Sequence, residues 1–426
     1  MRIIDTMESQ VRGYVRSFPV VFDRSKGAKL FDQEGKEYID FFAGAGTLNY
    51  GHNNDVSKEA MIEYLQSDGI LHGLDMATTA KIAFLESFST NILTPRNLEY
   101  KIQFTGPTGT NAVESALKLA RLIKGRSNIV AFTNAFHGLS AGSVSITGNT
   151  FYRDEAHISR SNVAFMPYDG FFGPDVNTID YFRKFLEDPS SGLDQPAAVF
   201  VEAIQGEGGV NIASAKWLKE LESLCHEYDM FLVIDDIQAG NGRSGDFFSF
   251  EEAGIFPDMV TVSKSIGGGL PMALLMIRPD LDQWKPGEHT GTFRGNNLAF
   301  VAARAMIDHY WTNSELTNAV KYKEKILRAE LEKIVEKHSK TFSMRVRGRG
   351  LFYGLEIDEP GFAGEVSALC FENGLVIELS GAKDQVVKFL PPLIIDEETL
   401  KEGINIVANA IDELAAQKLE RLSGSF

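Results

Sequence analysis

Apolar and polar positions alternate in a regular way across the middle of the chain. Between about residues 100 and 300, short runs of apolar and β-branched residues are separated by segments whose apolar residues recur at helical spacing. Strands that alternate with helices are typical of a mainly parallel α/β sheet. The predicted strands are Lys101–Phe104, Asn128–Phe132, Ala198–Val201, Phe231–Ile234 and Met259–Val262.

Two of the intervening segments predict amphipathic helices. Apolar residues between positions 113 and 120 fall on one helical face, and those between 218 and 225 do the same. The segment Asp188–Pro196 combines proline, glycine, serine and aspartate, which predicts a loop.

The pattern changes toward both ends of the chain. Residues Leu316–Lys337 predict a long charged helix, and Met344–Ile357 follows as a strand-rich stretch. Near the start, Val20–Phe22 and Lys29–Phe31 look like strands, with a turn at Asp32–Gly35. The order of predicted strands and helices in these end segments differs from the regular alternation in the central part of the chain.

The length of the chain also indicates more than one domain. A chain of 426 residues exceeds the size at which one hydrophobic core usually keeps growing. We predict a large domain from residues 51–310, and a smaller α/β domain built from residues 1–50 and 311–426.

Charge and composition narrow the possible partners. A net charge of −16 argues against nucleic acid or an anionic membrane as the partner. Two cysteines, Cys225 and Cys370, provide no disulfide framework or metal-ligand spacing, so no metal is expected. The N-terminus has no secretion-signal pattern and no apolar run is long enough to span a bilayer, which predicts a cytoplasmic protein. The run Arg345–Gly350 could bind RNA, but its apolar continuation favours a strand and turn.

A lysine and an acid at the ends of two predicted strands indicate cofactor chemistry. Lys264 directly follows one apolar strand, and Asp235 ends another. Pyridoxal phosphate needs a lysine amine for its Schiff base and a carboxylate that keeps the pyridine nitrogen protonated. Lys264 alone is typical of a surface lysine and Asp235 alone of a turn, so the prediction depends on the pair.

A third predicted strand leads into a glycine- and threonine-rich turn before a helix. Thr108, Gly109 and Thr110 lie at this turn, where small residues and helix N–H groups suit a phosphate. Asn111 and Glu114 resemble a helix-capping pair, so a well-capped helix without a ligand is the alternative.

Two further motifs follow predicted strands. Phe136, in Ala135–Gly138, is placed to stack on a cofactor ring, although a lone phenylalanine is more often part of a core. Glu202 and Glu207 lie in a glycine-rich segment after another strand. Because the carboxyl ends of parallel strands meet at one sheet edge, we expect all four motifs to converge there.

These motifs, in this order, resemble the class III (ω-amino acid) aminotransferases of fold type I, and the resemblance covers nearly the whole chain. It implies a large domain with a mainly parallel sheet, pyridoxal 5′-phosphate as cofactor, and a homodimer or higher homo-oligomer with its site at the subunit interface. Four longer runs resemble one branch, which moves an amino group between L-glutamate and L-aspartate-4-semialdehyde in ectoine biosynthesis: Phe42–Asn54, His72–Met76, Phe104–Glu114 and Asp282–Asn297.

The resemblance also implies roles for individual residues. Lys264 carries the cofactor and Asp235 pairs with its pyridinium. The other implied cofactor contacts are Gly109 and Thr110 with Thr108 at the phosphate, Phe136 and His137 at the ring, Gln238 near the phenolic oxygen, and Thr292 from the neighbouring subunit.

Substrate contacts are predicted at Glu202, Glu207, Arg294 and Lys388. Glu207 is expected to switch between the two amino donors, and Arg294 is expected either to clamp a carboxylate or to brace the subunit contact. Leu139 and Lys388 stand where ornithine- and 4-aminobutyrate-type relatives carry arginines, and lysine cannot replace a planar bidentate fork.

The reaction implied is ping-pong, with glutamate converted to 2-oxoglutarate and the semialdehyde to L-2,4-diaminobutyrate. Two alternatives remain open. One is another ω-amino acid transaminase or an aminomutase on the same scaffold, and the other is a binding module of the same fold without a cofactor.

Overall fold

The computed structural model describes residues 2–423 as an α/β protein with one large sheet and two four-stranded sheets. The large sheet has seven strands in the order β4-β12-β11-β10-β7-β5-β6. Only β12 runs antiparallel to its neighbours, so the other six strands point the same way. These strands are β4 (Lys101–Phe104), β5 (Ile129–Phe132), β6 (Val163–Met166), β7 (Ala198–Val201), β10 (Phe231–Asp235), β11 (Met259–Val262) and β12 (Leu274–Ile277).

Five strands were predicted close to their observed bounds, and two were not predicted. All four residues of β5, β7 and β11 are buried, as expected for central strands covered on both faces. The unpredicted strands, β6 and β12, occupy an edge and the antiparallel position.

Helices that connect these strands bury their apolar faces as predicted. In α6 (Gly109–Lys124) the buried residues include Val113, Ala116 and Leu117, and α6 packs on β10, β11 and β12. In α9 (Ala215–Glu227), Leu218, Leu221, Leu224 and Cys225 are buried. The remaining helices of this part are α4 (Asp55–Gln66), α5 (Thr79–Ser87), α7 (Ala141–Ser145), α8 (Thr178–Glu187) and α10 (Asn297–Tyr310).

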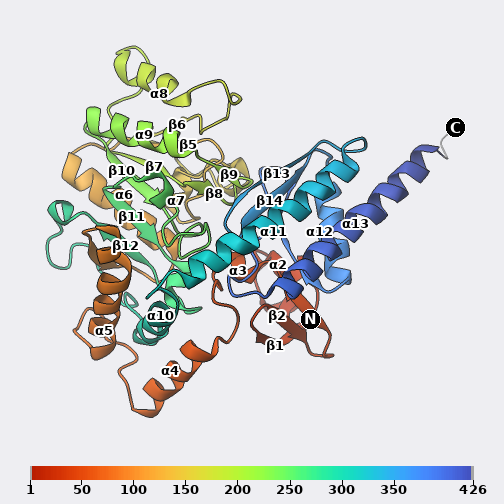
Figure 1. Ribbon diagram of the computed structural model, residues 1–426. Helices are drawn as coiled ribbons and strands as arrows, with labels where there is room; N and C mark the ends of the chain where they lie inside the picture. Colours follow the sequence, from red (N-terminus) through yellow and green to blue (C-terminus); the bar gives the residue numbers. More distant parts are fainter. Residues whose placement is uncertain (1, 424–426) are drawn as a thin grey trace.

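The two smaller sheets come from the ends of the chain. One has the order β1-β2-β3-β15, and its parallel β3–β15 pairing joins the N-terminal strands to the C-terminal segment. Figure 1 shows the red N-terminal strands and the blue C-terminal segments on the same side of the molecule. The predicted division into domains 51–310 and 1–50 with 311–426 stays a prediction. The strands of the two smaller sheets are β1 (Phe22–Lys26), β2 (Lys29–Asp32), β3 (Glu37–Asp40), β13 (Met344–Arg349), β14 (Phe352–Ile357), β15 (Leu375–Val376), β16 (Glu378–Ser380) and β17 (Val386–Phe389). Two further strands, β8 (Ile204–Gln205) and β9 (Asn211–Ile212), form a separate small hairpin.

The end segments bear out most of the sequence pattern. The long charged helix is α11 (Glu315–His338), and Met344–Arg349 forms strand β13, as favoured over an RNA-binding run. The strand predicted at Val20–Phe22 is wrong, because β1 begins only at Phe22 and runs to Lys26. Its polar residues pair with β2 at a sheet edge, where no face needs an apolar pattern. The other helices are α1 (Arg2–Met7), α2 (Tyr14–Ser17), α3 (Ala43–Gly46), α12 (Phe362–Glu372) and α13 (Glu397–Ser423).

No helix within residues 2–423 is long and apolar enough to cross a membrane.

Candidate active site

The segments that follow five parallel strands meet at one edge of the large sheet. They line a pocket of about 190 Å³. Its walls come from the ends of β5, β7, β10 and β11 and from the start of α6, so each motif that follows a predicted strand contributes. The lining residues are Gly109, Thr110, Phe136, His137, Gly138, Glu202, Ile204, Glu207, Asp235, Ile237, Gln238, Ala239 and Lys264.

Lys264 lies directly after β11, at the start of a short 3₁₀ turn, Lys264–Gly267. Its φ of +53° is left-handed, a conformation that costs energy for a residue with a Cβ and tends to occur at functional sites. Its Nζ donates a hydrogen bond to the carbonyl of Ala45 at 2.6 Å. Burial lowers the pKa of Lys264 to about 8, against the opposing effect of Glu207. The pocket therefore holds a lysine amine that loses its proton far more readily than usual.

Asp235 ends β10 and is held by a buried histidine. His137 Nδ1 lies 2.8 Å from Asp235 Oδ2, and since the carboxylate accepts, Nδ1 carries the proton. The other carboxylate oxygen accepts from the backbone N–H of Ile237 at 3.2 Å. The side chain of His137 is fully buried, and its Nε2 has no hydrogen-bond partner among the described residues. These contacts fix Asp235 at the pocket with a set orientation.

The start of α6 forms a second wall. Gly109 and Thr110 line the pocket, whereas Thr108 is the exposed N-cap residue and does not. A Cβ at Gly109 would lie 2.9 Å from Ile237 Cδ1, so a larger residue would require the Ile237 side chain to move. Thr110 Oγ1 lies 2.6 Å from Ser140 Oγ. The helix thus presents small residues and free N–H groups to the pocket.

The predicted Asn111–Glu114 capping pair is wrong. Asn111 Oδ1 instead accepts from the Oγ1 of Thr108 at 2.8 Å, so the cap lies one turn earlier. The Glu114 carboxylate accepts the N–H groups of Gly142 and Ser143 at 2.8 and 3.1 Å. Glu114 therefore ties α6 to α7, a contact that spacing along one helix does not reveal.

Glu202 lies deep in the pocket and accepts the N–H of Phe136 at 3.1 Å. Burial raises its pKa well above the ordinary range, and the nearby charge of Asp235 adds to this. The hydrogen bond fixes the backbone that carries the Phe136 ring.

Glu207, Gln238 and Lys388 form a hydrogen-bonded group at the pocket wall. Glu207 Oε1 accepts from Lys388 Nζ at 2.7 Å and from Gln238 Nε2 at 3.1 Å. Burial disfavours ionisation of Glu207, but Lys388 and Lys264 outweigh it and lower the pKa. The side chain of Lys388 is 0% exposed and pairs also with Glu378 at 3.0 Å. Lys388 itself does not line the pocket.

The structure does not bring Thr292 or Arg294 to this pocket. Thr292 is exposed, and Arg294 pairs with Asp75 on the surface and donates to the carbonyl of His289 at 3.4 Å. Leu139, beside the pocket residue Gly138, is 55% exposed.

Three neighbours of the site were not predicted from the sequence. Ala45 accepts from Lys264, Tyr14 donates to Glu378 at 3.0 Å, and Glu378 pairs with Lys388. Glu378 had a detectable signal, because it is an acid inside an apolar run from Leu375 to Leu379. Ala45 and Tyr14 had none, since each reaches the site through folding of the N-terminal segment.

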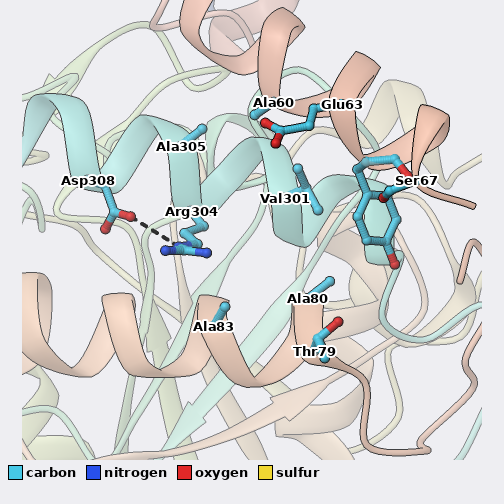
Figure 2. Close-up of a pocket in the computed structure, with 11 residues that line it drawn as sticks. Ala60, Glu63, Ser67, Thr79, Ala80, Ala83, Val301, Arg304, Ala305 and Asp308 are labelled. Atoms are coloured by element: carbon cyan, nitrogen blue, oxygen red, sulfur yellow. Dashed lines mark hydrogen bonds and ion pairs between the residues drawn. The ribbon is translucent and has the colours of Figure 1, made fainter. Parts of the chain in front are cut away.

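A larger cavity of about 470 Å³ lies elsewhere, between α4, α5 and α10. Figure 2 shows its lining, in which four alanines and Val301 lie among polar residues that include Glu63 and an ion pair, Arg304–Asp308, at 3.1 Å. This cavity is lined by neither a lysine nor an acid that is hydrogen-bonded to a histidine. The candidate chemistry therefore belongs to the smaller pocket around Lys264.

Comparison with known proteins agrees with the fold and the pocket. The family model "Aminotransferase class-III" matches residues 11–411. The chain belongs to this family, a class of aminotransferases that use pyridoxal 5′-phosphate.

Among curated relatives, the diaminobutyrate–2-oxoglutarate transaminase of Wolinella succinogenes is 63% identical over 426 residues, covering 100% of this chain and 99% of that protein. The enzyme of the same name from Streptomyces anulatus is 54% identical over 417 residues, covering 97% and 98%.

Solved structures show the same fold. The ornithine aminotransferase of Toxoplasma gondii superposes with a TM-score of 0.83 at 25% identity, covering 98% of this chain and 95% of that one. An S-selective transaminase from Bacillus megaterium reaches a TM-score of 0.86 at 20% identity, with 97% of each chain covered.

Proposed function

We propose that this enzyme is a diaminobutyrate–2-oxoglutarate transaminase. In this function L-glutamate gives up its amino group as 2-oxoglutarate, and L-aspartate-4-semialdehyde takes the group at its aldehyde carbon to become L-2,4-diaminobutyrate. The observation that carries the proposal is full-length identity of up to 63% to relatives of that name. The product would enter ectoine biosynthesis, and a cytoplasmic location is part of the proposal.

The residues of the pocket fit pyridoxal 5′-phosphate. When bound, this cofactor accepts electron density from the substrate carbon that loses a proton. Lys264 would hold its aldehyde, and Asp235, fixed by His137, would face its pyridine nitrogen. Gly109 and Thr110 would bind the phosphate at the N-terminus of α6, with Phe136 against the ring and Gln238 near the phenolic oxygen.

Lys264 also serves as the proton carrier. A general base works best when its pKa lies near the working pH, and the pKa of Lys264 is lowered to about 8. With the cofactor bound, the free amine of Lys264 would take the proton from the substrate carbon that bears the amino group and would deliver it to the cofactor's C4′. The carbonyl of Ala45, 2.6 Å from Nζ, holds the free amine at the pocket between these events.

Glu207 would decide which end of a substrate enters. Glutamate reacts at its α-amine and brings a carboxylate close to the site, whereas diaminobutyrate reacts at its terminal amine. We expect Glu207 to remain paired with Lys388 when diaminobutyrate binds. When glutamate binds, its carboxylate would displace Glu207 from this ion pair. Glu202 would lie beside the cofactor. Arg294 would brace the contact between subunits rather than bind the substrate.

A second copy of the chain would complete the site. Exposed apolar residues gather on α4, on the segment after it and on Phe293, which lies against His72 with ring centroids 5.4 Å apart. Such a surface is typical of a protein interface. Thr292, next to Phe293, would then reach the partner's phosphate site. Phe293→Asp should therefore produce monomers in sedimentation runs and weaken cofactor retention, and a dimer of unchanged strength would contradict this interface.

The reaction is tested by incubating the purified enzyme with glutamate and aspartate semialdehyde and detecting diaminobutyrate by chromatography. Formation of diaminobutyrate at a higher rate than with ornithine or 4-aminobutyrate as donor supports the proposal. Use of only the latter donors would favour another ω-amino acid transaminase.

The switch is tested with Glu207→Ala in single half-reactions. The change should alter one half-reaction at least about tenfold more than the other, because only one of them requires the Glu207–Lys388 pair to open. Equal losses with glutamate and with diaminobutyrate would remove Glu207 from this role.

A further inference from the structure

A buried lysine that contacts the pocket residue Glu207 is shared by two carboxylates. Lys388 in β17 and Glu378 in β16 are directly opposite each other in the antiparallel register. Lys388 Nζ lies 3.0 Å from Glu378 Oε1 and 2.7 Å from Glu207 Oε1. The lysine side chain is 0% exposed, so water cannot replace either carboxylate.

The two carboxylates differ in their freedom to move. Glu207 lines the pocket, and its side chain is 25% exposed. The side chain of Glu378 is 3% exposed, is fixed on a strand, and accepts a hydrogen bond from the Tyr14 hydroxyl at 3.0 Å. Glu207 is therefore the carboxylate that can leave, and Glu378 is the one that stays.

The hydrogen bonds of Lys388 point the same way. Its ammonium donates to Glu207 Oε1 at 2.7 Å and lies 3.0 Å from Glu378 Oε1, and both carboxylates raise the pKa of Lys388. Lys388 thus interacts with two carboxylates at the same time. A buried cation that loses its only partner is strongly destabilised, and a second carboxylate at 3.0 Å prevents that outcome when Glu207 leaves.

We propose that Glu378 is a positioning residue that sets how readily Glu207 leaves Lys388, and thereby the ratio of the glutamate and diaminobutyrate half-reactions. Glu378 acts in two ways. It shares the charge of Lys388, which weakens the hold on Glu207, and it neutralises Lys388 after Glu207 has moved. The inference rests on the switch role proposed for Glu207.

The test is Glu378→Gln, which removes the charge and keeps the size and the acceptor for Tyr14. Lys388 would then hold Glu207 alone, so the half-reaction that needs the pair to open should suffer. In single-turnover measurements of the loaded enzyme, the glutamate half-reaction should slow by about 10- to 100-fold, the usual range of coupling between two sites. The diaminobutyrate half-reaction should stay within about threefold, and Glu378→Asp, which keeps the charge, should restore most of the lost rate.

Glu356→Gln is the matched control. Glu356 is an acid on the neighbouring strand β14 that pairs with Arg347 at 3.3 Å and lies outside this cluster. It should change neither half-reaction selectively. If it does, loss of negative charge in general explains the effect, and the inference fails.

The remaining outcomes separate this inference from the proposed function. Equal loss of both half-reactions in Glu378→Gln, no loss, or a faster glutamate half-reaction would each overturn the role of Glu378. The same measurement is made with whichever α-amino and ω-amino donors the enzyme accepts, so it stands even if diaminobutyrate is not the product. If Glu207→Ala shows no selectivity between the donors, the inference falls with the switch.

Discussion

The lowered pKa of Lys264 leads to a prediction about how the enzyme without cofactor captures pyridoxal 5′-phosphate. Only a neutral amine attacks an aldehyde, so the capture rate follows the neutral fraction of Lys264. With an ordinary lysine pKa of ~10.4, roughly 1 amine in 2,500 is neutral at pH 7. With the pKa lowered to about 8, roughly 1 in 11 is neutral, a gain of ~200-fold.

The assay is stopped-flow absorbance after cofactor-free enzyme is mixed with pyridoxal 5′-phosphate between pH 6 and pH 10. The rate should rise tenfold per pH unit at low pH and level off above about 8, because the amine is then mostly neutral. A blocked lysine amide in the same buffers should continue to gain rate to ~10.4, which separates the effect of the pocket from that of the aldehyde. Lys264→Ala should show no such phase.

A rate for the enzyme that keeps rising past pH 9.5, parallel to the blocked lysine amide, would refute the reasoning. It would mean that burial beside Lys388 does not dominate over the carboxylates Glu207, Glu378 and Asp235, which raise the pKa.

Two further predictions concern the charges around this lysine. Asp235→Asn removes the partner of the pyridinium and should slow both half-reactions equally, by ~100-fold or more, as expected for loss of one active-site electrostatic contact; a loss in only one half-reaction would contradict that role. Lys388→Met leaves Glu207 and Glu378 buried without their cation and should lower the free energy of unfolding by about 3–5 kcal/mol in urea titrations. Without the cation the folded-state pKa values of both carboxyls rise, so the variant should lose stability as pH increases from about 5 to 8. A deficit independent of pH would indicate loss of packing instead.

The sequence by itself determined the central sheet and the main chemical residues. Period and composition located β4, β5, β7, β10 and β11, and all of these except β4 are fully buried, as expected for parallel strands covered on both faces. The carboxyl ends of parallel strands meet at one edge of the sheet. Because Lys264 and Asp235 each lie at the carboxyl end of such a strand, their positions in the sequence were enough to predict that they share one pocket. The edge strand β1 was missed because its residues are mostly polar. Strands β6 and β12 are apolar, but such short apolar runs cannot be distinguished from buried helix segments by periodicity alone.

Only the tertiary structure decided which groups touch. His137 on Asp235, Ala45 on Lys264 and Glu378 on Lys388 join residues 98, 219 and 10 positions apart, and no local pattern encodes such contacts. The charge of Lys388 was visible in the sequence, but its burial between two carboxylates was not. Contact between distant segments depends on how whole elements pack, whereas local structure depends on neighbours along the chain. For that reason the sequence predicted the reaction class, and the packing revealed how the pocket holds its charges.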